Sequence, residues 1–440
     1  MTAAPPPSAA ARAPRTVRPV AVVAGNRTPF ARAGGRYAQA SAKDLLVAAV
    51  DGLVARTGLA GERLGEVVAG AVLKHGRDLN LTREAVLSTA LDPATPAYDV
   101  SQACATGLQS AVLLAGKIAL GQVEAGIAGG ADSASDAPVA LDDGLRRVLL
   151  ALGRARTPAA RLKALAGLRP GQVVPQFPRN AEARTGLSMG EHAARTAAHW
   201  GVGREEQDAL ALASHRNLAA AYERGFFDDL LTPYLGLRRD GLLRPDTSAE
   251  KLAALEPVFG RDLDVPATMT AGNSTPLTDG AAAVLLSTDE WAAERGLDVL
   301  AHLVDAQTAA VDHVHRGEGL LTAPVHAVPV LLRRNGLTLQ DLDLVEVHEA
   351  FASTVLATLA AWEDEGFCRE RLGLDGALGV VDRSRLNVAG SSLATGHPFA
   401  ATGARILATT AKLLAERGGG RALISICAAG GQGIAALVEA

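Results

Sequence analysis

Residues 105–121 read ATGLQSAVLLAGKIALG, and residues 401–420 read ATGARILATTAKLLAERGGG. Each stretch opens with Ala-Thr-Gly and continues as a mostly apolar helix. The first is followed by EAGIAGGAD at 124–132 and the second by RALISICAAGGQG at 421–433, so that each helix leads to a strand and a glycine turn. Apolar residues on nearly all sides of the first helix predict that it is buried. Two matching units indicate a duplicated α/β fold, in which two similar sheets pack through shared helices.

The composition of the 440 residues is typical of a compact α/β protein. Hydrophobic residues make up 48% and charged residues 20%, a balance that argues against disorder. The formal net charge of -4 gives no basic field for nucleic acid. The three cysteines are too few for a disulfide scaffold and favour a reducing compartment. No apolar run reaches the roughly 18 residues that a membrane span needs, and the excess of arginine over lysine is typical of bacteria with GC-rich genomes.

Changes of character along the chain predict its domains. Residues 1–16 are rich in proline and alanine and lack acids, which predicts a disordered tail, with a transit peptide as the alternative. Residues 17–137 together with 266–293 are expected to form an N-terminal half. Residues 294–440 are expected to form the C-terminal half. Residues 138–265, which differ in composition from both halves, are expected to form an inserted domain.

The inserted domain contains an arginine-rich stretch without acidic residues from 146 to 169. Its basic residues are Arg146, Arg147, Arg154, Arg156, Arg161, Lys163 and Arg169. Leucines at helical spacing between them predict two amphipathic helices, with Pro158 in the turn. Cationic amphipathic helices bind anionic membranes or an acidic partner. A solvated surface without a partner is the alternative.

Cys104 lies directly before the first repeated helix. A helix N-terminus presents free N–H groups and a partial positive charge, which favour a thiolate. Its small neighbours Ala103, Ala105 and Gly107 leave room for a substrate. A buried structural cysteine is the alternative for any single cysteine.

The second repeat carries further reactive side chains in comparable turns. His397 lies between Gly396 and Pro398, where an imidazole can act as a base or donor near neutral pH. Cys427 ends a strand at a glycine turn. Two thiols and imidazoles that converge on one cleft suit acyl transfer, with one thiol as nucleophile and the other moving a proton. Cys368, in EDEGFCRER, has no such turn and is expected to be incidental.

Other common chemistries lack their motifs. His348 and Glu349 occur in VHEAFA, but Ala352 stands where the second histidine of HExxH would be, which argues against a zinc protease. The chain has no CxxC pair, no GxxxxGK loop and no GxGxxG after a strand. A metal site, a nicotinamide site and nucleotide hydrolysis therefore have no support.

The order of eight motifs, from about Val17 to Ala440, resembles the thiolase family. The motifs are GNRTPFAR, SQACATGLQ, AGGADSAS, SMGEHAA, TAGNSTPLTDGAAAVLLS, HEAFA, NVAGSSLATGHPFAATGAR and CAAGGQG. The HEAFA and NSTPLTDG variants are most similar to the β-subunit of fatty-acid β-oxidation multienzyme complexes. The resemblance implies an α/β, thiolase-like five-layer αβαβα fold of two duplicated halves with an inserted loop domain that binds coenzyme A (CoA). It also implies a homodimer or a dimer-based tetramer.

The resemblance implies a role for each reactive side chain. Cys104 would be the acylated nucleophile, His397 its activating base and Cys427 the proton donor and acceptor. His348, where common biosynthetic thiolases have asparagine, would join His397 in pointing N–H groups at the thioester oxygen. The backbone N–H groups of Cys104 and Ala429 would form a second oxyanion site. The family usually has glycine at the latter position, so the turn must suit a Cβ there.

The resemblance also places contacts for CoA, which would be a co-substrate. No metal or redox cofactor is implied. Arg244 and Thr275 fall where the family contacts CoA. Phe259 and Phe351 fall where apolar groups pack against its pantetheine arm.

The implied function is that of an acetyl-CoA C-acyltransferase, which uses CoA to cleave 3-ketoacyl-CoA to acetyl-CoA and a shortened acyl-CoA. The alternatives are a biosynthetic acetoacetyl-CoA thiolase, a ketoacyl synthase-like condensing enzyme, and a non-catalytic acyl-CoA or sterol carrier. A condensing enzyme does not require Cys427, and a carrier could lose either thiol, so the retention of both favours a thiolase. The implied setting is the bacterial cytoplasm. A β-oxidation α-subunit (hydratase/dehydrogenase) and peripheral contact with a membrane are the candidate partners.

Overall fold

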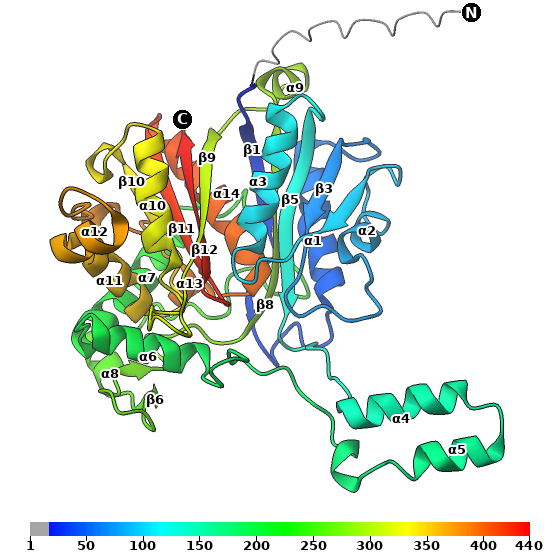
Figure 1. Ribbon diagram of the computed structural model, residues 1–440. Coiled ribbons are helices and arrows are strands. Elements are labelled where there is room, and N and C mark those ends of the chain that lie inside the picture. Colours follow the sequence, from blue (N-terminus) through cyan, green and yellow to red (C-terminus); the bar gives the residue numbers. More distant parts are fainter. Residues whose placement is uncertain (1–16) are drawn as a thin grey trace, which may run out of the picture.

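The computed structural model describes residues 17–440, and the expected tail at 1–16 lies outside the described residues (Figure 1). The N-terminal half supplies the strands β1 (Ala21–Arg27), β2 (Ala31–Arg32), β3 (Glu66–Ala69), β4 (Ala97–Asp99), β5 (Ala125–Ser133) and β8 (Thr278–Ser287). The C-terminal half supplies β9 (Ala301–Ala310), β10 (Leu344–Val347), β11 (Arg421–Ala428) and β12 (Gln432–Glu439). The strands expected at the end of each repeat are thus β5 and β11.

The strands of both halves form one mixed sheet. In the described part of the chain, its order is β10-β11-β12-β9-β1-β8-β5-β3-β4, with β2 on β8. The pairs β3–β4, β3–β5 and β10–β11 are parallel, and the others are antiparallel. Within residues 17–440, β1 and β9 join the two halves through only two residue pairs, Ala21 with His302 and Val22 with Ala301. The expected two sheets are therefore linked edge to edge by a short seam.

Helices complete the layers on either side of the strands (Figure 1). Between the two halves lie α3 (Thr106–Ala119) and α14 (Thr402–Arg417), which contact each other and strands of both halves. On the outer face of the N-terminal half lies α1 (Ala42–Thr57), which packs against α2 (Leu81–Val86). The outer face of the C-terminal half is covered by α10 (Ala323–Arg334), α11 (Ala352–Glu363) and α12 (Glu365–Leu372). The order of layers confirms the expected αβαβα fold.

The repeated Ala-Thr-Gly has a structural reason, because it brings the two central helices into backbone contact. A Cβ at Gly403 would lie 2.2 Å from the backbone nitrogen of Leu108. A Cβ at Gly107 would lie 2.6 Å from the carbonyl oxygen of Ala400 and 2.8 Å from the nitrogen of Ala404. Real Cβ atoms do not approach backbone so closely. The paired glycines therefore set the distance between the helices that carry Cys104 and His397 at their N-terminal ends.

Replacing Gly403 with alanine should lower the free energy of unfolding by about 1–3 kcal/mol, because overpacking against backbone cannot be relieved by a rotamer change. Gly116→Ala is the matched control in the partner helix, since a Cβ there meets no atom within 4 Å. That control should be neutral or stabilising by up to about 1 kcal/mol. Urea unfolding of both variants measures the difference, and equal stability of the two would contradict the proposed close crossing.

The inserted residues form two parts with different surroundings. The expected amphipathic pair is present as α4 (Asp143–Arg154) and α5 (Pro158–Leu165), and Pro158 is the first residue of the second helix. These helices have no buried residues and project from the body of the molecule (Figure 1). We call them, with their connection, the helical hairpin (143–165).

The remaining insert packs beside the C-terminal half. It comprises α6 (Met189–His199), α7 (Arg204–Glu223), α8 (Ala249–Ala253) and β6 (Pro257–Phe259), which pairs with β7 (Met269–Thr270). Helices α6 and α7 pack on α11, and α7 also packs on α13 (Ser392–Thr395). The short α9 (Asp289–Glu294) follows β8. Among residues 17–440, no helix is both long enough and apolar enough to cross a membrane.

Candidate active site

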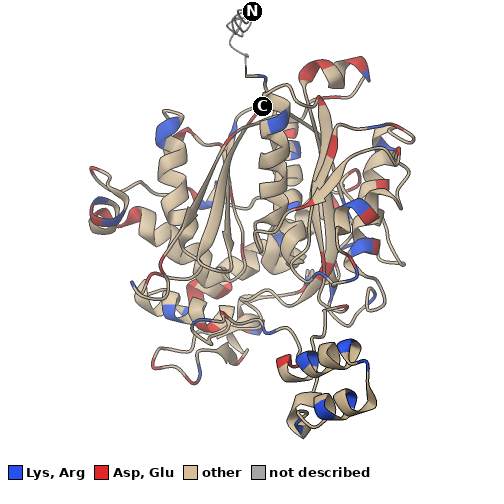
Figure 2. Ribbon diagram, turned by 45° about the vertical axis from the view of Figure 1, so that its right-hand side comes forward, with Lys and Arg blue, Asp and Glu red and all other residues tan. Residues whose placement is uncertain are grey.

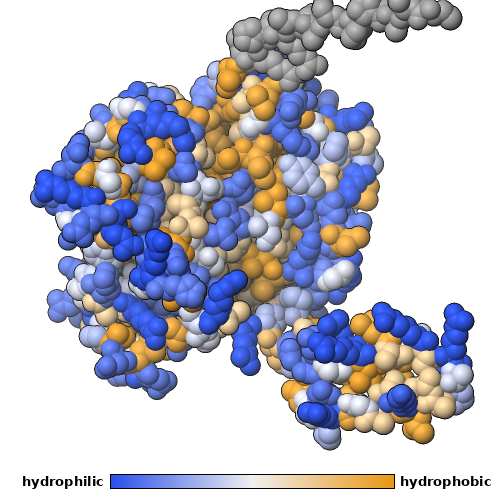
Figure 3. All heavy atoms as spheres, in the orientation of Figure 1, coloured by the Kyte–Doolittle hydropathy of each residue, from blue (hydrophilic) through white to orange (hydrophobic). Residues whose placement is uncertain are grey.

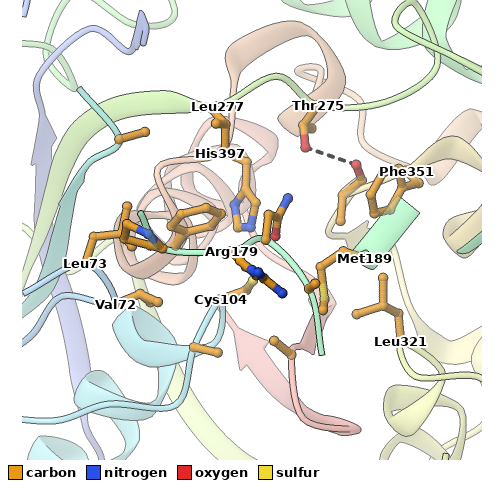
Figure 4. A pocket seen from close by; sticks show the side chains of 18 of the residues that line it. Val72, Leu73, Cys104, Arg179, Met189, Thr275, Leu277, Leu321, Phe351 and His397 are labelled. Carbon is orange, nitrogen blue, oxygen red and sulfur yellow. Dashed lines mark hydrogen bonds between the residues drawn. The ribbon is translucent and has the colours of Figure 1, made fainter. Parts of the chain in front are cut away.

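A cavity of about 280 Å³ lies where the two halves and the insert meet. Its wall includes Cys104, His397, Cys427 and Ala429. Figure 4 shows Cys104 and His397 directed into the same space from different elements. The structure therefore brings together the reactive side chains of both repeats.

A tight turn places Cys104 in this cavity. Ala103 has φ 46°, a left-handed conformation that is costly for a residue with a Cβ. Thr106 holds the turn, because its hydroxyl donates to the carbonyl of Ala103 at 2.7 Å and accepts from the N–H of Gln102 at 2.9 Å. Cys104 thus stands at the start of α3, where its partly buried side chain packs against the core and also lines the cavity.

Burial controls the ionisation of both thiols. Desolvation raises the pKa of Cys104 to about 12, although the backbone N–H groups of Ala429 and of Cys104 itself act in the opposite direction. Desolvation and the nearby thiol of Cys104 likewise raise the pKa of Cys427. The expected thiolate is therefore not favoured at rest, because desolvation outweighs the helix N-terminus. Cys104 needs a base to become a nucleophile.

Two histidines lie against each other beside the thiols. The ring centroids of His348 and His397 are 4.2 Å apart. His348 follows β10, and its Nδ1 lies 2.8 Å from the Oγ of Ser392. The Nδ1 of His397 lies 2.7 Å from the Oγ1 of Thr402. The Nε2 atoms of both histidines are buried and find no hydrogen-bond partner in the described part of the chain. Each histidine therefore keeps one nitrogen without a protein partner, and of the two rings that of His397 lines the cavity while that of His348 lies directly behind it.

Both histidines are neutral at pH 7. Burial and, to a smaller extent, the cation of Arg405 together lower the pKa of His397 to about 3. Burial, followed by His397 and Arg405, holds the pKa of His348 well below its usual value. A neutral imidazole has one N–H donor and one lone-pair acceptor. The pair can therefore supply both a base and a hydrogen-bond donor.

Buried acids and one asparagine hold the loops around the site. Asp132, at the end of β5, accepts from the N–H groups of Val72, Leu73 and Ala400. Glu349, next to His348, accepts from Ser214, from Asn387 and from the backbone of Leu393. These bonds tie the cavity wall and the α13 loop to strand ends. The acids of AGGADSAS and HEAFA thus act as anchors.

The turn after β11 accommodates the alanine that replaces the family's usual glycine. The left-handed positions in this turn are Gly430, with φ 82°, and Gly431, with φ 71°. Ala429 is not among the described non-glycine residues with positive φ, which are Ala103, Leu235 and Asn387. Its N–H nevertheless points at the sulfur of Cys104. A Cβ at this position therefore does not disturb the N–H donor.

Three of the four expected CoA contacts lie at the cavity. Phe259 and Phe351 line it and meet edge to face with ring centroids 5.9 Å apart. Thr275 also lines it, and its hydroxyl donates to the carbonyl of Ala350 at 3.0 Å (Figure 4). Arg244 is exposed and lies outside the cavity wall. Cys368 is buried in α12, also away from the cavity.

Sequence reasoning missed two sets of residues. The first completes the cavity wall and includes Val72, Leu73, Arg179, Met189 and Leu321. Apart from Met189, which lies in the SMGEHAA motif, no local signal marks these residues, because they come from loops and helices far apart in the chain. The second set lies behind the histidines and comprises Ser392, Thr402 and Arg405. Ser392 precedes His397 in the sequence, and Thr402 and Arg405 follow it within the same motif. These polar groups close to His397 are a signal from which partners of the histidines could have been predicted.

Models of two protein domains match nearly the whole chain. The model of the thiolase N-terminal domain matches residues 20–290. The model of the thiolase C-terminal domain matches residues 297–440.

Individual proteins show the same similarity. The chain is 42% identical over 426 residues to a 3-ketoacyl-CoA thiolase of Yersinia enterocolitica, with 96% of each chain covered. It is 43% identical over 426 residues to a 3-ketoacyl-CoA thiolase of Pectobacterium carotovorum, again with 96% of each covered. Human mitochondrial 3-ketoacyl-CoA thiolase in complex with CoA superposes with a TM-score of 0.79 at 29% identity, covering 96% of this chain and 98% of that one. The acetyl-CoA acetyltransferase of Bacillus anthracis gives a TM-score of 0.79 at 29% identity, covering 97% and 100%.

Proposed function

The chain belongs to the thiolase family, and from this premise we propose how its cavity performs acyl transfer. The protein is an acyltransferase with 3-ketoacyl-CoA thiolase activity. One observation carries the assignment of the site. Two thiols from different repeats share a cavity with His397, whose ring lies against that of His348, and the Nε2 atoms of both histidines have no hydrogen-bond partner among the described residues.

In the first step, His397 takes the proton of Cys104, and the thiolate attacks the C3 carbonyl of the 3-ketoacyl-CoA. The N–H groups of Cys104 and Ala429 stabilise the oxyanion that forms there. The C2–C3 bond then breaks, which leaves an acyl group on Cys104 and an acetyl-CoA enolate. His348 and protonated His397 donate to the enolate oxygen, and Cys427 protonates its carbon. One preorganised donor of this kind is worth roughly 3–4 kcal/mol.

In the second step, the Cys427 thiolate takes the proton of free CoA. The CoA thiolate attacks the acyl group, and the sulfur of Cys104 leaves and recovers its proton from His397. Every proton is thus returned, and the site needs no redox cofactor. Run in reverse, the same groups perform a condensation.

For CoA itself, we propose a binding mode that follows the length of the molecule. The apolar pantetheine arm would lie against Phe259 and Phe351 beside Thr275, which all line the cavity. Arg244 is exposed outside the cavity and would meet the phosphates at the far end of CoA. A guanidinium suits this role because it forms charge-assisted hydrogen bonds to phosphate.

The test of the function is the absorbance of the magnesium–acetoacetyl-CoA complex, followed with and without free CoA. We expect the absorbance to fall only when free CoA is present, because CoA accepts the acyl group. Binding of acetoacetyl-CoA without turnover would favour the non-catalytic carrier instead.

The relatives and the surface of the enzyme support a proposal for its setting. We propose that it works in the bacterial cytoplasm as a homodimer or a dimer-based tetramer, and that it associates peripherally with a membrane through the helical hairpin. Figure 2 shows basic residues along both hairpin helices, and Figure 3 shows apolar side chains beside them on the same projection. Leu149, Leu150, Leu162 and Leu165 are all exposed. Cationic and apolar groups on one exposed hairpin are what an anionic lipid surface binds.

Changing Arg146, Arg147, Arg154 and Arg156 together to glutamine should weaken co-sedimentation with phosphatidylglycerol vesicles at least tenfold. The reason is that each basic residue near an anionic membrane contributes about 1 kcal/mol, and the effect should shrink as salt is added. A matched control changes four exposed arginines outside the hairpin, Arg36, Arg63, Arg238 and Arg383, to glutamine.

Equal binding by both variants would show that net charge alone is responsible. If the parent protein binds no vesicles and a β-oxidation α-subunit is bound instead, the hairpin is a protein-docking surface. If the hairpin variant only raises KM for CoA, these arginines serve the CoA phosphates.

A further inference from the structure

The hydroxyl of Ser392 lies between a buried cation and the catalytic histidine pair. Its Oγ is 2.8 Å from the Nδ1 of His348 and 3.0 Å from the Nη2 of Arg405. Ser392 is fully buried, and Arg405 is 3% exposed. Neither residue lines the cavity, and His348 itself lies one layer behind the wall, with its ring against that of the lining residue His397. Ser392 and Arg405 can therefore act on the substrate only through the histidine pair, and this inference rests on the proposed thiolase reaction.

The direction of the hydrogen bonds follows from what each group can donate. A guanidinium is donor-only, so Arg405 must donate to the Oγ of Ser392. The hydroxyl proton of Ser392 then needs an acceptor. The Nδ1 of His348 is the acceptor to which Ser392 is hydrogen-bonded in the described residues. The Nδ1 thus carries a lone pair, and the single ring proton of neutral His348 lies on Nε2.

The neighbouring histidine lacks this constraint. The Nδ1 of His397 contacts Thr402 at 2.7 Å, and no cation donates to that hydroxyl in the described residues. Because a threonine hydroxyl can donate or accept, the bond survives in either tautomer and in the protonated ring. His397 can therefore take and return a proton without losing its partner. The two histidines therefore differ in their hydroxyl partners: the hydroxyl that contacts His348 is held by Arg405, whereas the hydroxyl that contacts His397 can either donate or accept.

The surroundings keep Arg405 directed at the serines. Its Nη2 also donates to the Oγ of Ser391, at 3.2 Å. Burial lowers the pKa of Arg405, and the charges of two buried glutamates, Glu346 and Glu349, act in the opposite direction and raise it. Glu349 is already bonded to Ser214, Asn387 and the backbone of Leu393, and the oxygens of Glu346 have no hydrogen-bond partner among the described residues. Arg405 makes no ion pair within 4 Å among the described residues. Its hydrogen bonds are thus available to fix the two serine hydroxyls.

We propose that Ser392, oriented by Arg405, is a positioning residue that holds His348 in the Nε2–H tautomer, so that His348 is a permanent donor to the thioester oxygen while His397 remains the group that exchanges the proton. In this arrangement the donor cannot be consumed as a competing base. A preset tautomer also removes the cost of reorientation when the enolate forms.

The direct test is the tautomer of His348 in the resting enzyme, measured by NMR of the full-length protein with ¹⁵N-labelled histidine rings and assigned with a His348→Asn variant. We expect an Nε2 that carries a proton and an Nδ1 that does not. A proton on Nδ1 would overturn the proposal. This measurement needs no turnover, so the tautomer can be determined whether or not the protein is active. Absence of thiolysis in the wild-type protein would refute the proposed function, and the NMR measurement would still decide the tautomer.

The kinetic test compares Ser392→Ala with Ser391→Ala. Both remove one hydroxyl that accepts from Arg405, but only the first removes the partner of His348. We expect Ser392→Ala to lower kcat about 10–100-fold, as for other residues that orient a functional histidine. KM for CoA should stay within about threefold, because the contacts of CoA are untouched. Ser391→Ala should stay within about threefold in both constants.

Equal losses in the two serine variants would overturn the positioning role, since a general loss of packing would affect both. If Ser392→Ala does not fold, the wild-type tautomer still decides the proposal. The proposal is supported if the ring proton of His348 is no longer confined to Nε2 in the folded Ser392→Ala variant and kcat of that variant is also lower.

Discussion

Cys104→Ser is expected to lose both half-reactions, with kcat/KM reduced at least about 10⁴-fold, a loss of the size that removal of a nucleophile causes in other acyl-transfer enzymes. A serine hydroxyl is a far weaker nucleophile than a thiolate near neutral pH. The protein should still fold, because Cys104 is only partly buried at the cavity wall and serine replaces a single atom of its side chain.

Intact mass spectrometry after incubation with acetyl-CoA measures the first half-reaction directly. The parent protein should gain one acetyl group that maps to Cys104, and the variant should gain none. Cys368→Ala is the matched control, since this thiol is buried in α12, where its sulfur contacts the carbonyl of Ala361 at 3.4 Å. That control should acylate normally. An acetyl group on Cys368 in the parent protein would refute the assignment of the nucleophile.

Cys427→Ser should separate the two half-reactions. Acylation of Cys104 by acetyl-CoA should persist, because Cys104 and His397 remain in place. Cleavage of 3-ketoacyl-CoA should fall at least about 10²–10⁴-fold, the usual contribution of a positioned acid or base. The physical reason is that the enolate then lacks its proton donor, and free CoA lacks the thiolate that deprotonates it.

Two assays on the same Cys427→Ser preparation measure this separation. Intact mass follows the acetyl adduct, and the magnesium–acetoacetyl-CoA absorbance follows cleavage. Near-normal cleavage would remove Cys427 from the mechanism. Loss of the adduct as well would show that Cys427 supports the nucleophile rather than the proton transfer.

The sequence by itself determined the duplicated architecture and the reactive side chains. The repeated Ala-Thr-Gly, the apolar helices and the glycine turns are local signals, and they predicted the central helices α3 and α14 and the strands β5 and β11. Cys104, His397 and Cys427 were found in the same way, because each lies in a turn that its neighbours encode. The hairpin was also predictable, since amphipathic spacing and charge belong to a single segment.

Only the tertiary structure decided how these groups behave. The thiol of Cys104 is protonated at rest because the folded chain desolvates it, and desolvation depends on residues from the whole cavity wall. The sequence pattern had suggested a thiolate, because it showed the helix N-terminus and not the burial. The structure places Arg244 outside the cavity wall. The position of a side chain relative to the cavity depends on the folded chain, and no local sequence pattern contains it.

The same holds for the groups that orient the site. Asp132 reaches Ala400 across 268 positions of sequence, and Ser392 reaches His348 across 44. Such contacts form only when separate elements pack, so neither periodicity nor turn chemistry reports them. The reactive atoms are encoded locally, whereas their protonation, tautomer and orientation depend on long-range hydrogen bonds in a desolvated interior.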